Sequence, residues 1–113
     1  MQPKEITHAI GIDLGSSYCS VGFWDRDKPH IVYNGDSGAN KFCSYVTYTK
    51  EGGERLFDIP ARAQALRHPK NTPFNIINLL GRDLDSQRLQ NLVCSLPFDM
   101  KRNEEKNNLF FEA

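Results

Sequence analysis

The segment from Ile10 to Tyr18 reads Ile-Gly-Ile-Asp-Leu-Gly-Ser-Ser-Tyr, and it decides how the N-terminal third of the chain folds. Its first half is a short apolar run that ends in a carboxylate. Its second half is a Gly-Ser-Ser turn, after which another apolar run extends to Trp24. Two such runs on either side of a glycine turn predict two β-strands, residues 9–14 and 18–24, joined in a hairpin.

The turn of this hairpin has the composition of a phosphate-binding loop. Gly15 allows the backbone to approach an anion closely, while the amides and hydroxyls of Ser16 and Ser17 supply hydrogen-bond donors. Asp13 faces the same anion, and two negative groups lie comfortably together only when a cation such as Mg²⁺ separates them. The hypothesis is therefore a nucleoside triphosphate site. The alternative is a polar hairpin turn that binds no ligand.

The overall composition argues against binding through bulk charge. The 113 residues include 14 acidic and 14 basic side chains, so the formal net charge is zero and nonspecific attraction to nucleic acid or anionic lipid is not expected. The apolar runs are too short to cross a bilayer, and the first residues lack the apolar core of a secretory signal. We expect one domain at most, with a modest core, in the reducing cytoplasm.

The cysteines and histidines are widely separated and show no zinc-ligand spacing. We expect the three cysteines to be free buried thiols, at Cys19, Cys43 and Cys94. We expect the three histidines to be plain surface residues, at His8, His30 and His68.

Two further strands are predicted after the hairpin. A charged turn at Asp25–Pro29 leads into a third strand at His30–Tyr33, which completes an antiparallel meander of three strands. A glycine-rich loop at Asn34–Asn40 precedes a fourth strand at Ser44–Thr49, where β-branched and aromatic residues alternate. Glu51–Gly53 ends that strand.

The middle of the chain predicts two short helices. Asp58 is a good helix cap, because its carboxylate can accept from the free amides of the first turn, and the helix should extend to about His68. Pro69 stops it. A second helix is expected at Phe74–Leu80 and ends at Gly81.

The C-terminal part predicts one helix and one hairpin. Asp85 or Ser86 caps the helix, whose apolar face includes Leu89. The segment Pro97–Ala113 has two apolar arms around a polar tip at Asn103–Asn108. The order of strands, short helices and a hairpin is an α+β pattern.

The stretch Ala9-Ile-Gly-Ile-Asp-Leu-Gly-Ser-Ser-Tyr-Cys-Ser-Val-Gly22 resembles the opening of the seventy-kilodalton heat-shock chaperone family. The nucleotide-binding domain of that family has the actin and sugar-kinase fold, a ribonuclease H-like ATPase fold. Further matches follow at the family's spacing, at Asp36, Gly38, Ser44–Thr49, Glu54–Leu56, Gln64, Asn71, Thr72, Phe74, Leu80–Arg82, Pro97 and Phe98. The resemblance extends from about Ala9 to the C-terminus.

The resemblance implies a role for each residue of the hairpin turn. Asp13 faces Mg²⁺ and its waters, and the β- and γ-phosphates of ATP or ADP are cradled by Gly15, Ser16, Ser17 and Tyr18. Residues 1–38 correspond to subdomain IA of the family and residues 39–113 to the peripheral subdomain IB. Nucleotide is the implied ligand, and a co-chaperone or another protein is the possible partner.

One departure from the family concerns its catalytic lysine. The family carries this lysine three residues after the phenylalanine that matches Phe74, and here the position is Ile77. Its ammonium helps to stabilise the γ-phosphate and to orient the attacking water. Loss of one such charged donor typically reduces the rate about 10²–10³-fold, so we expect poor hydrolysis.

A second departure concerns the other half of the ATP site. The family's second phosphate loop and adenosine pocket lie beyond the residues matched here, so we expect the 113 residues to bind nucleotide weakly. The function expected is that of a truncated ATP-binding chaperone domain with little independent ATPase activity. The alternatives are a noncatalytic protein-interaction module and a nonfunctional relic of a chaperone.

Overall fold

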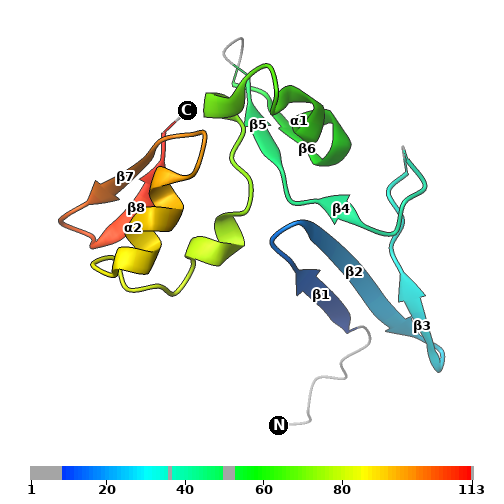
Figure 1. Cartoon of the computed structure of the whole chain (residues 1–113). Helices are drawn as coiled ribbons and strands as arrows, with labels where there is room; N and C mark the ends of the chain where they lie inside the picture. Colours follow the sequence, from blue (N-terminus) through cyan, green and yellow to red (C-terminus); the bar gives the residue numbers. More distant parts are fainter. Residues whose placement is uncertain (1–8, 36, 50–52, 113) are drawn as a thin grey trace, which may run out of the picture.

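The structure is a computed structural model that describes residues 9–35, 37–49 and 53–112 (Figure 1). The predicted meander is present in it as three antiparallel strands, β1 (Ile10–Leu14), β2 (Tyr18–Asp25) and β3 (Lys28–Ile31), in the order β1-β2-β3. Ile12 lies opposite Val21 in the register of β1 and β2. The first strand is therefore an edge strand of this sheet.

The turn between β2 and β3 is shorter than predicted. Arg26 and Asp27 have φ angles of 44° and 69°, in the left-handed region that two-residue hairpin turns require. The third strand consequently begins at Lys28 rather than His30, and it ends at Ile31, two residues before the predicted end. The charged residues and proline of this segment predicted a longer turn, but Lys28 and Pro29 pair with β2 and are part of the strand.

The predicted fourth strand, Ser44–Thr49, is divided in the structure. β4 (Phe42–Cys43) pairs with the beginning of β2, whereas β5 (Val46–Tyr48) pairs with β6 (Arg55–Phe57), which the sequence analysis missed. The chain leaves the first sheet at Ser44, whose amide donates to the hairpin turn instead of to a partner strand. The strand therefore changes sheets at this residue.

The first helix, α1 (Asp58–Gln64), is shorter than predicted and begins differently. Its N-cap is Phe57, and no side chain caps it, so the prediction that Asp58 caps the helix is wrong. Asp58 has a φ of 61°, and this backbone turns its carboxylate toward the neighbouring sheet. The prediction that Pro69 stops the helix is also wrong, because α1 ends at Gln64 and Pro69 instead begins a 3₁₀ turn, η1 (Pro69–Asn71).

The second predicted helix is reduced to one 3₁₀ turn, η2 (Ile76–Leu79). Asn75 precedes it with a left-handed φ of 60°, which breaks the helical run that the apolar residues predicted. Gly81, with a φ of 69°, reverses the chain after η2 as expected.

The last helix and hairpin agree with the prediction. Ser86 caps α2 (Gln87–Cys94), and its hydroxyl accepts from the amide of Leu89 at 3.3 Å. β7 (Met100–Asn103) and β8 (Asn108–Phe111) form the C-terminal hairpin. The fold class is therefore α+β, with a meander, short helices and a terminal hairpin, as predicted.

A chain of aromatic rings joins the middle of the molecule to this hairpin. Tyr45 stacks on Phe74 with ring centroids 5.0 Å apart, and Phe74 meets the edge of Phe98 at 5.7 Å. Phe98 in turn meets Phe111 of β8 at 5.7 Å and is 2% exposed. Leu89 of α2 is also 2% exposed, so Phe98 and Leu89 are both core residues of the C-terminal part.

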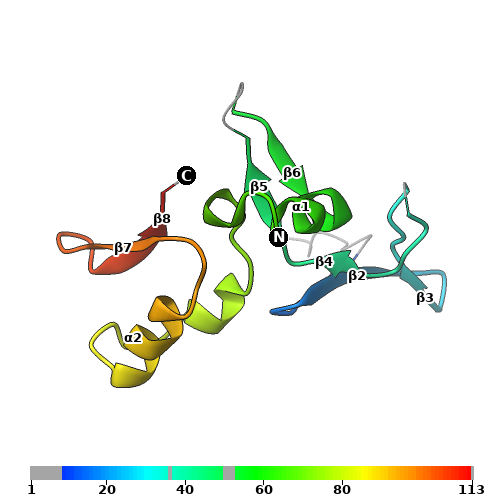
Figure 2. The same cartoon turned by 45° about the horizontal axis from the view of Figure 1, so that its top comes forward.

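The molecule is open in shape. Its radius of gyration is 17.8 Å, whereas a compact chain of this length has about 13 Å. In Figures 1 and 2, β3 and the β7–β8 hairpin lie at opposite ends, with α1, β5 and β6 between them. Strand β1 remains uncovered, and Ile12 is 67% exposed. Among the described helices, none has the length and apolarity to cross a membrane.

The cysteines and histidines agree only partly with the predictions. All three cysteines are free, but only Cys43 is buried; Cys19 is half-buried and Cys94 exposed. His30 and His68 are exposed, as predicted. The predictions for His8, Asp36, Glu51, Gly52 and Ala113 lie outside the described residues.

Candidate functional site

The turn between β1 and β2 accepts only glycine at its first position. A Cβ atom on Gly15 would lie 2.3 Å from the carbonyl oxygen of Tyr18, well inside van der Waals contact. That oxygen belongs to the backbone, so the clash cannot be relieved by rotating a side chain. Glycine is therefore required at this position by the shape of the turn itself, a steric reason separate from the predicted close approach of an anion.

Ser44 braces the same turn from outside the hairpin. Its hydroxyl donates to the carbonyl of Gly15 at 2.7 Å, and its amide donates to the carbonyl of Ser17 at 3.0 Å. The carbonyls of Gly15 and Ser17 thus both accept hydrogen bonds from Ser44, the residue that follows β4. Within the described part of the chain, the amides of Ser16 and Ser17 donate to no acceptor. The turn therefore presents unused donors, as a phosphate-binding nest does.

A buried carboxylate holds Ser44 in place through its neighbour Cys43. Asp58 is 8% exposed, and its carboxylate accepts from the amide of Cys43 at 2.6 Å and from the side-chain amide of Asn34. These contacts tie the beginning of α1 to β4 and to the loop after β3. The position of the hairpin turn thus depends on a residue more than forty positions away in the sequence.

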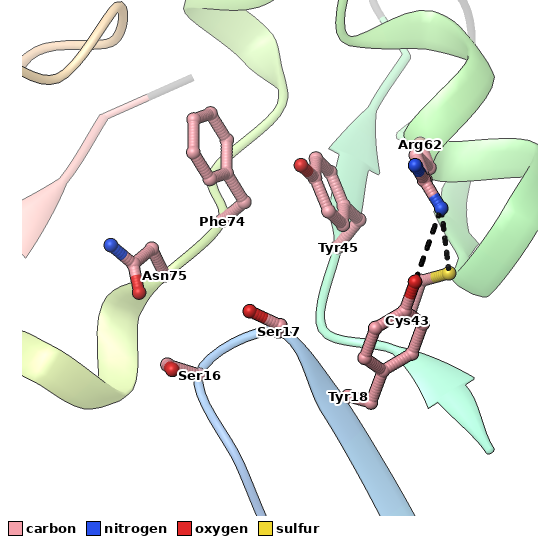
Figure 3. Close-up of a pocket in the computed structure, with 8 residues that line it drawn as sticks. All are labelled: Ser16, Ser17, Tyr18, Cys43, Tyr45, Arg62, Phe74 and Asn75. Atoms are coloured by element: carbon pink, nitrogen blue, oxygen red, sulfur yellow. Dashed lines mark hydrogen bonds between the residues drawn. The ribbon is translucent and has the colours of Figure 1, made fainter.

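The turn forms one wall of a cleft of about 310 Å³. Its lining combines polar turn residues with side chains from β4, α1 and the segment before η2, namely Ser16, Ser17, Tyr18, Cys43, Tyr45, Arg62, Phe74 and Asn75. Figure 3 shows the two serines on the turn, Phe74 and Asn75 to one side of them, and Arg62 with Tyr18 to the other. Three of the four predicted phosphate-binding residues therefore line this cleft, and Gly15 does not.

Arg62 is a cleft residue that the sequence analysis missed. Its Nη1 donates to the phenol oxygen of Tyr18 at 3.5 Å and to the sulfur of Cys43 at 4.0 Å. The pKa of Arg62 is raised, first by the hydrogen bond to Cys43 and then by electrostatic attraction to Tyr18. No local motif singles out this arginine, because α1 brings it to the hairpin only through tertiary folding.

A family model described as Hsp70 protein matches residues 9–111 of the chain. The chain belongs to the Hsp70 family. This match confirms the resemblance found in the sequence, and with the α+β architecture it supports a part of an actin-like ATPase domain. Hsp70 proteins are chaperones that bind ATP.

Asp13, the predicted magnesium-facing residue, lies on β1 of this Hsp70 chain. It is exposed, pairs across the hairpin with Ser20, and does not line the cleft. The described residues contain no group of three or more carboxylate, cysteine and histidine side chains that could hold a metal ion. Any role of Asp13 toward Mg²⁺ therefore needs oxygen ligands from the nucleotide and from water.

Ile77 is the residue that the sequence resemblance aligns with the family's catalytic lysine. It lies in η2, is half-buried, and lines a larger apolar cleft of about 590 Å³ that also includes Leu14, the last residue of β1. The structure thus places this position beside the strand that leads into the phosphate turn. The side chain of Ile77 adds apolar surface to this cleft and carries no charge.

Proposed function

We propose that this Hsp70 chain binds the β- and γ-phosphates of ATP or ADP at the turn formed by Gly15, Ser16, Ser17 and Tyr18. The observation that carries the proposal is the orientation of the turn. Ser44 engages its carbonyls, which leaves the amides and hydroxyls of Ser16 and Ser17 for an anion. The glycine at its first position, where a Cβ would clash, supports the same role.

Mg²⁺ enters this proposal with the nucleotide. Proteins commonly hold Mg²⁺ through one or two carboxylates together with substrate phosphates and water. Asp13 is one exposed carboxylate on the strand that leads into the turn, so it fits as a single ligand acting through water. Asp13 would hold water ligands of the ion, which would supply positive charge to the phosphates when bound.

We further propose that hydrolysis by this chain is slow. Transfer of the γ-phosphoryl group depends on positive charge where negative charge develops, and one lost donor reduces the rate about 10²–10³-fold. Ile77 provides no charge, and the next residue, Asn78, is neutral as well.

Residues 1–38 serve as a subdomain IA-like phosphate-binding part and residues 39–113 as a subdomain IB-like lobe.

Isothermal titration with Mg-ATP tests the binding proposal. The wild-type chain is compared with Gly15→Ala and with the double variant Ser16→Ala/Ser17→Ala, after circular dichroism has confirmed that each is folded. Saturable heat for the wild type and a loss of affinity in both variants supports the proposal. Absence of binding by the folded wild type, or equal affinity in all three proteins, contradicts it.

A single-turnover assay with radiolabelled ATP tests the proposed slow hydrolysis. We expect release of phosphate close to the rate in buffer. A magnesium-dependent turnover that Asp13→Asn abolishes would refute the assignment of Ile77 as a disabled catalytic position. In that case another residue supplies the charge.

A second candidate function is a noncatalytic module that binds a protein, such as a co-chaperone. The apolar cleft around Ile77 and Leu14 favours it, because exposed apolar surface of this kind commonly marks interaction sites. The two candidates differ in the titration: a folded chain that gives no heat with Mg-ATP favours the second.

A further inference from the structure

The guanidinium of Arg62 has no acidic partner near the phosphate turn. Its side-chain contacts are the hydroxyl of Tyr18 and the sulfur of Cys43. Among residues 9–35, 37–49 and 53–112, the ion pairs involve Lys101 and Arg102 and not Arg62. A positive charge therefore stands at the cleft without an opposite charge from the described protein.

The chemistry of the cleft suits an anion. Hydroxyl groups of Ser16, Ser17 and Tyr18 line it, and the described lining includes no carboxylate. Amides of the turn add donors that are not used elsewhere in the described structure. The cleft of about 310 Å³ is lined by hydrogen-bond donors and one cation. Such a lining complements a phosphate group better than it complements a neutral or cationic ligand.

We propose that Arg62 binds the phosphate chain held by the Ser16–Ser17 turn. This inference rests on the proposed nucleotide-binding function. Arginine suits the role because its planar fork can donate two hydrogen bonds to one phosphate. Arg62 is a binding residue of the site, and it reaches the cleft from α1 instead of from η2.

The contacts of Arg62 with Tyr18 and Cys43 hold its side chain at the cleft that Ser16 and Ser17 also line. Tyr18 and Cys43 are paired across β2 and β4, so both acceptors are fixed by the sheet. Figure 3 shows the guanidinium hydrogen-bonded to these two groups, with Ser16 and Ser17 on the turn that leads into Tyr18. The alternative is a purely structural role, in which Arg62 only packs the helix against the sheet.

Titration of the 113-residue chain with inorganic tripolyphosphate and with Mg-ATP tests the inference. Arg62→Gln removes the charge and keeps most of the side chain, and Arg62→Lys keeps the charge but loses the fork. Arg67→Gln is the matched control, since Arg67 is an exposed arginine just after α1 that does not line the cleft. Urea unfolding of each variant measures any structural contribution separately.

We expect Arg62→Gln to weaken the binding of both ligands about tenfold or more. Arg62→Lys should weaken binding by less, and Arg67→Gln should leave the affinity unchanged. The salt dependence of binding should also become shallower in Arg62→Gln alone, which a structural role does not predict.

Three results would overturn the inference in different ways. If the wild type binds and Arg62→Gln binds equally well, the turn holds phosphate without this arginine, and the proposed function survives. If the folded wild type binds neither ligand, the proposed function fails and the inference fails with it. A loss of stability in Arg62→Gln without a change in affinity shows that its role is structural.

Discussion

Replacement of Asp58 tests the network that positions the phosphate turn. In Asp58→Ala the amide of Cys43 loses its acceptor in a buried position, which costs about 1–3 kcal/mol. The side-chain amide of Asn34 also loses this acceptor, but it is half-buried and water can replace part of the contact. We therefore expect Asp58→Ala to lower the free energy of unfolding by about 2–3 kcal/mol.

The left-handed backbone of Asp58 makes the prediction more specific. Asp58→Gly loses the same hydrogen bonds, but glycine adopts a φ of 61° without the steric cost that alanine has there. Asp58→Gly should therefore be more stable than Asp58→Ala by about 1 kcal/mol. Urea unfolding followed by circular dichroism measures both variants beside the wild type. Equal midpoints for wild type and Asp58→Ala, or a lower midpoint for Asp58→Gly than for Asp58→Ala, would refute this reasoning.

The remaining predictions concern the turn, the aromatic core and the thiols. Gly15→Ala should destabilise the chain by about 1–3 kcal/mol in urea unfolding, because the new Cβ meets the backbone of Tyr18; an unchanged midpoint would contradict this. Phe98→Ala should destabilise it by about 3–5 kcal/mol, since the ring is buried between two others, and a loss below 1 kcal/mol would show that the core is misassigned. In the native chain a thiol reagent followed by mass spectrometry should modify Cys94 first and Cys43 last, and the reverse order would contradict their burial.

The hairpin and its turn could be predicted from local sequence. Apolar alternation and a Gly-Ser-Ser turn are short-range signals, and they located β1, β2 and the cleft-lining serines. The cap of α2 at Ser86 is equally local. In each case the residues that make the structure are neighbours in the sequence.

The parts that could not be predicted depend on long-range contacts. Strand β6 contains only three residues and exists because β5 pairs with it. Aspartate is a common helix cap, which is why the sequence predicted that role for Asp58. In the structure its carboxylate instead accepts from the amide of Cys43, so the tertiary contact prevails over the local preference. Arg62 enters the candidate site for the same reason, because only the packed helix brings it beside the hairpin.

The measurement that tests the central claim most directly is a titration of the ¹⁵N-labelled chain with Mg-ATP, followed by amide resonances in NMR spectra. The account predicts saturable shifts that are largest for the amides of Ser16 and Ser17, which have no acceptor in the described structure. Shifts centred elsewhere, or no shift in a folded chain at millimolar nucleotide, would contradict the assignment of this turn as a phosphate-binding site.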